Sequence, residues 1–234
     1  MKKTLLLASS LFTLGTVAVI STSTLTSVQA STTKSFGSTS SVDSIDSEVV
    51  ILDKGEFDSP MLLDPYDYSL NSLGFNTGKL VFSYTSTSLV DLDETVEKYF
   101  NLKLPKEFNL ISDKDGGEDL REAITASYKL PGQSDYKKLS GDAIDTSHKG
   151  QINFTLPTSA IISTGEITNF RIQIDFGKIL DSLKLGGDYD YTQQIPNASD
   201  GSYHLKGALS SSSHFKALPE GAALGYTNGG KAIK

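Results

Sequence analysis

The chain has 234 residues, no cysteine and a formal net charge of −7 at pH 7. The lack of cysteine excludes disulfides, thiolate catalysis and cysteine-based metal sites. The negative charge argues against nucleic acid and anionic lipid as partners, because like charges repel.

The first 30 residues predict a signal peptide. Lys2 and Lys3 precede an apolar run from Leu5 to Ile20, and the segment ends in VQA, which predicts cleavage after Ala30. The apolar run is shorter than the roughly 20 residues that cross a bilayer, so a membrane anchor is the weaker interpretation. We therefore expect secretion. Loss of the two lysines takes the formal charge from −7 to −9.

The segments at the two ends of the mature chain are polar. Residues 31–47, STTKSFGSTSSVDSIDS, predict a disordered Ser/Thr-rich leader because they bury too little apolar surface. The C-terminal GYTNGGKAIK shows no LPxTG motif with a hydrophobic tail. We expect an extracellular protein, released or held at the cell surface by non-covalent contacts, without stable membrane insertion. A secreted chain with a Lys-Lys signal and no cysteine is typical of a Gram-positive bacterium.

Alternation of apolar and polar residues dominates residues 48–209 and predicts one domain. It is clearest at residues 170–176, FRIQIDF, where every second side chain is apolar. Strands are expected near residues 48–52, 80–84, 100–104, 124–130, 152–156, 170–176 and 203–205. The predicted fold class is all-β, an antiparallel β-sandwich, Ig-like or jelly-roll-like, with one or two short helices. Residues 210–234 are expected to form a C-terminal segment with a final strand and a flexible tail.

Three strands share an ending. LKLP, YKLP and FTLP end at Pro105, Pro131 and Pro157, at intervals of 26 residues. Proline has no N–H for a ladder and holds the preceding residue in an extended conformation. We therefore interpret the three endings as strand termini rather than a ligand motif, and we predict strands that end at Leu104, Leu130 and Leu156.

Two segments compete for helix. In FGKILDSLKL, residues 176–185, the apolar side chains keep helical spacing and predict a short helix after the best strand. In DLDETVEKYF, residues 91–100, Asp93 is expected to cap a turn, and the chain is expected to be extended by Tyr99.

The stretch SDKDGGEDLRE, residues 112–122, collects carboxylates around two glycines. The first hypothesis is a solvated acidic loop, and the alternative is a structural calcium site, since calcium binds six to eight oxygens. The stretch does not match the EF-hand loop, because Glu118 stands where that loop has glycine. The expected calcium ligands are Asp113, Asp115, Glu118 and Asp119. No other cofactor is expected.

Two Asp-Tyr repeats are candidate contact surfaces. Tyr66 and Tyr68 in LLDPYDYSL, and Tyr189 and Tyr191 in GGDYDYTQQ, lie in polar surroundings. Exposed tyrosines can bind a glycan or a protein in place of the absent tryptophan. The alternative is that they are half-buried at strand ends.

Recognisable catalytic motifs are lacking. The histidines are His148, His204 and His214, and the sequence contains neither G-x-S-x-G nor H-E-x-x-H. A hydrolase with carboxylates scattered among strands stays an alternative. A third hypothesis is a toxin in which FSYTSTSL, residues 82–89, converts into a membrane barrel.

The signal sequence, the Ser/Thr-rich leader and the strand-rich body with Leu-Pro endings resemble secreted or surface-associated β-sandwich proteins of Gram-positive bacteria, adhesin modules included. The sequence departs from anchored adhesins in lacking the sorting signal, and from WxL wall-binding proteins in lacking tryptophan. The resemblance implies a non-catalytic protein that binds a glycan or protein at the cell surface or in the extracellular matrix. Recognition is expected on loops at the sandwich ends or on an unpaired edge strand.

Overall fold

The computed structural model describes residues 49–63, 79–179, 195–196, 198–213 and 215–229. All of them belong to one compact unit, Ser44–Lys234. None of the helices in these ranges is long and apolar enough to cross a membrane.

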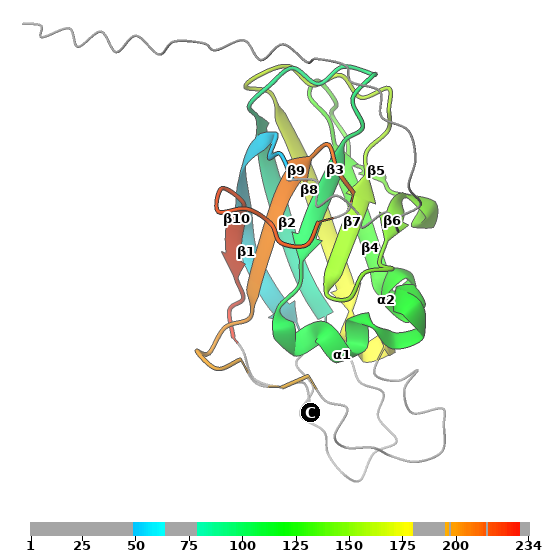
Figure 1. The fold of residues 1–234 in the computed structure, drawn as a ribbon, viewed down its shortest axis with the longest axis vertical. Coiled ribbons are helices and arrows are strands. Elements are labelled where there is room, and N and C mark those ends of the chain that lie inside the picture. Colours follow the sequence, from blue (N-terminus) through cyan, green and yellow to red (C-terminus); the bar gives the residue numbers. More distant parts are fainter. Residues whose placement is uncertain (1–48, 64–78, 180–194, 197, 214, 230–234) are drawn as a thin grey trace, which may run out of the picture. The chain divides into compact units, whose positions relative to one another are not determined.

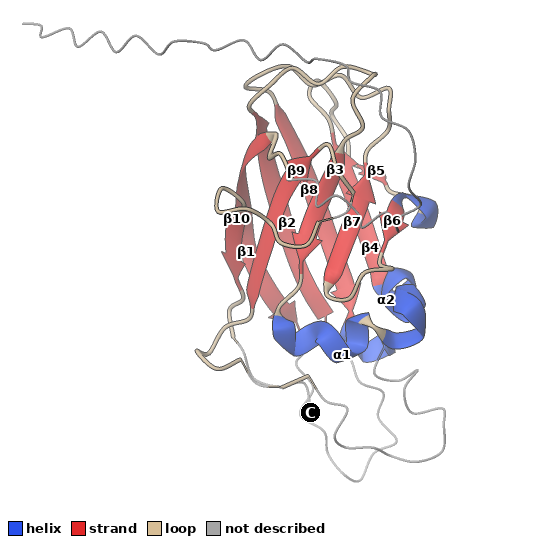
Figure 2. Cartoon of the chain, in the orientation of Figure 1, coloured by secondary structure: helices blue, strands red, loops and turns tan. Residues whose placement is uncertain are grey.

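Two five-stranded antiparallel sheets form the body (Figures 1 and 2). Sheet A has the order β10-β9-β3-β7-β6, and sheet B has the order β1-β2-β8-β4-β5. The strands of sheet A are β10 (Ala223–Tyr226), β9 (His204–Ser210), β3 (Tyr99–Lys103), β7 (Gln151–Thr155) and β6 (Ile144–Asp145). Those of sheet B are β1 (Asp53–Leu63), β2 (Lys79–Ser88), β8 (Ile167–Asp175), β4 (Ile124–Lys129) and β5 (Lys137–Lys138). The predicted antiparallel β-sandwich is confirmed.

The core lies between the sheets because alternate residues of each strand face inward. On β2 the even-numbered positions are buried, and on β8 the buried positions likewise alternate. Phe100 of β3 is central: its ring centroid lies 4.7 Å from that of Phe170, 5.7 Å from that of Phe154 and 4.3 Å from that of Tyr84. Full burial of such a side chain contributes about 1.5–3 kcal/mol, so this aromatic cluster joins the sheets firmly.

The Leu-Pro endings terminate strands as predicted. β3, β4 and β7 end at Lys103, Lys129 and Thr155, one residue before each leucine. The N–H of Leu104 still donates to Gly150 O at 2.9 Å, and that of Leu156 to Lys98 O at 2.9 Å. Each proline therefore stands where the chain leaves its sheet.

The prediction for the first strand was wrong. Within the predicted residues 48–52, Ile51 forms only an isolated bridge with Ser210, and β1 begins at Asp53. The register of β1 shifts between Asp58 and Met61, where Ser59 has a positive φ of 39°. This bulge interrupts the alternation of side chains, so the period of two is lost from the sequence.

Two strands, β5 and β6, were not predicted, whereas a final strand was expected in the segment that contains β10. β5 and β6 have two residues each, too few for any periodicity to appear. β10 lies within the segment 210–234 and pairs with β9.

The acidic stretch was predicted as a loop, and this was wrong, because it is largely helical. Short helices follow one another between β3 and β4, and a further one precedes β6: η1 (Lys106–Phe108), α1 (Asn109–Ser112), η2 (Lys114–Gly117), α2 (Glu118–Ala123) and η3 (Gly141–Ala143). The turn into α2 depends on Gly117, whose φ is 88° and where an added Cβ would lie 2.0 Å from Thr146 O. Thr146 Oγ1 donates to Gly117 O at 2.7 Å. A period-based prediction cannot recognise helices of four to six residues.

Both competing segments behave as predicted. Residues 176–179 are helical, and the remainder of that prediction lies outside the described residues. In the other segment, Asp93 Oδ1 accepts hydrogen bonds from Thr95 N at 2.8 Å and Thr95 Oγ1 at 2.6 Å, and β3 starts at Tyr99. FSYTSTSL, the segment assigned to a membrane barrel in the toxin hypothesis, lies almost wholly in β2, between β1 and β8.

Candidate functional site

The two ends of the sandwich differ in construction. We call residues 89–98 and 156–166, which connect β2 to β3 and β7 to β8, the loop end. It is drawn at the top of Figure 1. We call η1, α1, η2, α2 and residues 176–179 the helix end, drawn at the bottom.

Backbone hydrogen bonds join the two loops of the loop end to each other. Leu92 and Ile162 form an isolated bridge with N···O distances of 2.8 and 2.9 Å. Ser88 N donates to Glu166 O at 2.9 Å, and Gly165 N donates to Ser88 O at 2.8 Å. The two loops are therefore held in place by backbone hydrogen bonds to each other and to the end of β2.

A buried lysine fixes the first loop from inside. Lys98 is only 1% exposed, and its Nζ donates to Asp93 O at 2.5 Å and to Val96 O at 2.7 Å. Burial lowers the pKa of this ammonium. Since its hydrogen bonds go to main-chain carbonyls, Lys98 stabilises the conformation of the loop, and its charged group does not lie on the surface.

Large aliphatic side chains on this ordered scaffold point into solvent. Leu92 and Ile162 are buried as anchors, but their neighbours are exposed: Leu89 by 54%, Val90 by 43%, Ile161 by 66% and Ile167 by 48%. Single exposed apolar residues are ordinary, whereas several on two hydrogen-bonded loops and the strand that follows make a candidate contact surface. We call Leu89, Val90, Ile161 and Ile167 the aliphatic set.

Carboxylates accompany the aliphatic set. Asp91 Oδ1 accepts from Thr164 N at 2.7 Å and from Thr164 Oγ1 at 2.9 Å. Glu166 Oε2 accepts from Ser163 N at 2.6 Å. The Thr164 amide, followed by its hydroxyl, lowers the pKa of Asp91, and the Thr95 hydroxyl, followed by its amide, lowers that of Asp93. Asp91 and Asp93 therefore stay ionised at any physiological pH.

The last carboxylate of the first loop contacts a tyrosine at the start of β3. Tyr99 Oη donates to Glu97 Oε2 at 2.6 Å. Burial, with Glu97 as the next cause, raises the pKa of Tyr99 to about 12. Tyr99 is therefore a neutral donor at physiological pH.

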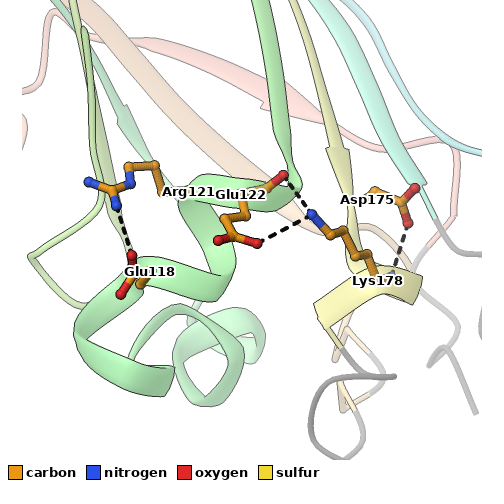
Figure 3. Close-up of polar contacts among 5 residues, drawn as sticks. All are labelled: Glu118, Arg121, Glu122, Asp175 and Lys178. Carbon is orange, nitrogen blue, oxygen red and sulfur yellow. Dashed lines mark hydrogen bonds and ion pairs between the residues drawn. The ribbon is translucent and has the colours of Figure 1, made fainter. Parts of the chain in front are cut away.

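The helix end pairs its charges instead. Figure 3 shows Arg121 Nη2 3.1 Å from Glu118 Oε1 and Lys178 Nζ 3.5 Å from Glu122 Oε2. Lys178 Nζ also donates to Glu122 O at 3.2 Å, and Lys178 N donates to Asp175 Oδ1 at 3.1 Å. These contacts tie α2 to the short helix that follows β8.

The expected calcium ligands belong to these separate pairs. Asp113 lies 3.1 Å from Lys149, Asp115 lies 2.8 Å from Lys114, and Asp119 lies 3.5 Å from the same lysine. Across the described ranges, no group of three or more histidine, aspartate or glutamate side chains could hold a metal ion. Calcium binding stays a prediction that these contacts do not favour.

The other candidate residues are scattered. Tyr66, Tyr68, Tyr189, Tyr191 and His214 lie outside the described residues. His148 lies in the turn before β7, with Nδ1 3.1 Å from Ser147 Oγ. His204, at the start of β9, places Nε2 2.7 Å from Asp200 Oδ2 and stacks edge-on against Tyr226.

A carboxylic acid in the core was missed by sequence reasoning. Asp53 of β1 is 2% exposed; its Oδ2 accepts from Tyr84 Oη at 2.8 Å and its Oδ1 from Leu209 N of β9 at 2.9 Å. Tyr84 Oη also lies 3.3 Å from Gly207 O. Burial raises the pKa of Asp53 and is also the main cause of the raised pKa of Tyr84. The group links the sheets inside the protein, where a macromolecule cannot reach it.

A second buried polar group lies on the outer face of sheet A, under residues 215–222. Asn101 Nδ2 donates to Ser210 Oγ at 2.6 Å and to Ser212 O at 2.8 Å, and Gln151 Nε2 donates to Phe215 O at 2.8 Å. Asn153 is the register partner of Asn101. The side-chain oxygens of Asn101, Gln151 and Asn153 are buried and have no hydrogen-bond partner among the described residues. Such oxygens are costly, so this layer is a weakly stabilised part of the fold.

The sequence contained a usable signal for the loop end. Leu89-Val90 and Ile161-Ile162 are adjacent apolar pairs. Because neighbouring side chains of an extended chain point to opposite sides, such a pair beside a turn leaves at least one member exposed unless a second surface covers it: Ile161 is exposed beside buried Ile162, and both Leu89 and Val90 are exposed.

No protein-family model and no curated protein matches the chain. The solved structures that resemble it include the partial N-terminal region of an enterococcal surface protein, with 13% identity and a TM-score of 0.36 over 77% of this chain and 48% of that chain. The B domain of a biofilm-associated protein has 10% identity and a TM-score of 0.34 over 78% and 44%. AvmM, titled as catalysing macrocyclization in alchivemycin A biosynthesis, has 10% identity and a TM-score of 0.34 over 76% and 86%.

The first two of these likenesses are with proteins named for a surface or a biofilm, the class that the sequence resembles. The chain spans about half the length of those two structures. All three similarities are too low to transfer a function or a residue role.

Proposed function

We propose that this chain is a secreted, non-catalytic β-sandwich that binds its partner through the loop end. The observation that carries the proposal is the aliphatic set: three large apolar side chains exposed on two loops that hydrogen bonds hold to the sheets, and a fourth, Ile167, exposed at the start of β8. A binding site on an ordered scaffold loses little conformational entropy when it binds. Two loops held in this way are therefore better suited to recognition than mobile loops would be.

The strand edges support binding less well. β5 and β6, at one side of the sandwich, have two residues each, and the exposed Lys137 and Lys138 form β5. On the other side, Asn228 accepts from Leu62 N at 2.8 Å and donates to Pro60 O at 3.1 Å, so β1 is tied to the segment after β10. Short, charged or covered edges discourage the addition of a partner strand.

Secretion rests on residues 1–30, whose charged start, apolar run and VQA ending predict a cleaved signal. We place the protein outside the cell, released or held at the surface without a covalent bond. The tyrosine pairs Tyr66/Tyr68 and Tyr189/Tyr191 are proposed as additional contacts with the same partner.

The test compares two variants of the secreted full-length protein. Leu89→Ser with Ile161→Ser removes half of the aliphatic set. Leu110→Ser, at an equally exposed leucine of α1, is the matched control. Retention on intact Gram-positive cells, purified wall and immobilised matrix proteins is measured for each.

We expect the double variant to lose at least about tenfold in retention, because central apolar contacts dominate interface energies. The control should bind as wild type does. Equal retention of all three proteins contradicts a binding loop end, and turnover of a wall polymer contradicts a non-catalytic role.

A further inference from the structure

We infer that the loop end binds a cationic protein surface, one with an apolar centre and a rim of lysine or arginine. This inference rests on the proposed function and specifies the partner's chemistry. It is carried by the charge of the two loops that display the aliphatic set.

Within residues 89–98 and 156–166 the acidic residues are Asp91, Asp93, Glu94, Glu97 and Glu166, and the basic residue is Lys98. Lys98 is buried, and its ammonium group donates hydrogen bonds to two main-chain carbonyls. The exposed charges of these loops are therefore all negative, with four in residues 89–98 and one, Glu166, at the end of residues 156–166. In the described part of the chain none of the five carboxylates forms an ion pair, in contrast to those of the helix end.

The carboxylates are positioned to accept further hydrogen bonds. Asp91 and Asp93 use Oδ1 for the contacts within the loops, and Glu97 and Glu166 use Oε2. Among the described residues, the second oxygens of Asp91, Glu97 and Glu166 accept no hydrogen bond, and each carboxylate is oriented by the bond that it already makes. A partner's guanidinium or ammonium would gain charge-assisted hydrogen bonds with little ordering of the side chains.

Other occupants fit these observations less well. A second copy would bring the same acidic surface against itself, and like charges across an interface are strongly unfavourable. An anionic membrane is repelled for the same reason. A glycan is bound most readily on aromatic faces, and the aliphatic set has none.

The acidic character has a boundary. Thr87 of β2 pairs with both Lys54 of β1 and Ile167 of β8, so a basic side chain stands in the register row of Ile167 on the outer face of sheet B. We therefore expect the cationic side of the partner to contact the two loops, and the other side of the partner to contact the outer face of sheet B.

The test uses three synthetic helical peptides of equal length, built from leucine and lysine, leucine and glutamate, or serine and lysine. Their binding to the full-length protein is measured by calorimetry at about 50 and 500 mM salt, which spans weak and strong screening. One variant neutralises the loop end (Asp91→Asn, Glu94→Gln, Glu97→Gln). Its matched control neutralises three acids of the helix end (Asp113→Asn, Glu118→Gln, Glu122→Gln).

We expect the leucine–lysine peptide to bind best. The loop-end variant should weaken it at least about tenfold at low salt and much less at high salt, whereas Leu89→Ser with Ile161→Ser should weaken it at both. The helix-end control should change binding little. Equal binding of the leucine–glutamate peptide, equal loss in the two charge variants, or no binding of the leucine–lysine peptide overturns the inference.

The two proposals can fail separately. If Leu89→Ser with Ile161→Ser abolishes retention on cells while the neutralised loop end is retained as wild type, the loop end binds its partner and the cationic rim is wrong. Equal binding of the serine–lysine peptide would show attraction by charge alone and would also overturn the apolar centre.

Discussion

Both ends of the sandwich contain acidic and apolar side chains, but the two ends expose different groups to solvent. At the helix end, carboxylates meet lysine or arginine, and the short helices cover the core between β3 and β4. At the loop end, the described carboxylates accept hydrogen bonds from N–H and hydroxyl groups of the two loops and of Tyr99, without an ion pair among the described residues, and aliphatic side chains reach solvent. An end whose charges are already paired has little to offer a partner, whereas one with unpaired charge around apolar groups has stability to gain from a contact.

Truncation of a buried leucine at each end should have the largest effect. Leu92→Ala at the loop end and Leu120→Ala in α2 remove side chains that are almost fully buried, and each should cost about 2–5 kcal/mol of unfolding free energy. Urea titration measures both. At temperatures where both variants stay folded, only Leu92→Ala should weaken binding. Equal loss of binding in the two variants would contradict the proposal that only the loop end binds the partner.

Gly117→Ala tests how tightly the helix end is closed. Its φ of 88° disfavours a side chain, and the new Cβ would clash with Thr146 O. We therefore expect the free energy of unfolding to fall by about 1–3 kcal/mol or more, measured by thermal denaturation. Gly116→Ala is the control, because its φ is also positive but nothing lies within 4 Å of its Cβ. Similar melting temperatures for the two variants would show that the turn can relax.

Asp53 should make stability depend on pH in the direction opposite to the loop-end aspartates. Its pKa is raised in the folded protein, so the folded state binds the proton more tightly than the unfolded chain. The contribution of this group is therefore most favourable below the unfolded value of 3.8 and declines as pH rises through the folded pKa. The pKa values of Asp91 and Asp93 are lowered, so their contributions hold above that value and are lost as pH falls below it.

Asp53→Asn isolates this effect, since the amide, like the protonated acid, is neutral and can still accept a hydrogen bond through its oxygen. We expect the variant to be at least as stable as wild type at pH 7 and to lose that advantage near pH 4, in denaturant titrations across this range. Tyr84→Phe should destabilise at every pH, by about 1–3 kcal/mol, because it leaves a buried acceptor unpaired. A pH-independent difference between wild type and Asp53→Asn would contradict a raised pKa.

Calcium should have the smallest effect. Because Asp113, Asp115 and Asp119 each lie beside a lysine, we expect the melting temperature to be the same in calcium and in chelator. A calcium-dependent rise that disappears in Asp113→Ala with Asp115→Ala would instead establish a metal site at the helix end.

Much of the sandwich followed from local patterns. Residues 80–84, 124–130 and 170–176 alternate because one face of each strand is buried, and their neighbours in the sheets could be expected to do the same. β1 escaped detection because its bulge breaks the period, and α1 and α2 because helices of four and six residues carry almost no periodic signal. The candidate site was predicted only as a class of location, loops at an end of the sandwich. Its residues were not named.

The sequence by itself determined the alternating strands, their Leu-Pro termini and the negative charge, because each depends on residues close together in the chain. Only the tertiary structure decided which acids are paired. Glu122 meets a lysine 56 residues away, and Asp91 meets a threonine 73 residues away. It also decided which members of the adjacent apolar pairs are exposed to solvent, since burial depends on what another part of the chain covers. The contrast between a closed helix end and an open loop end therefore arises from contacts across the fold.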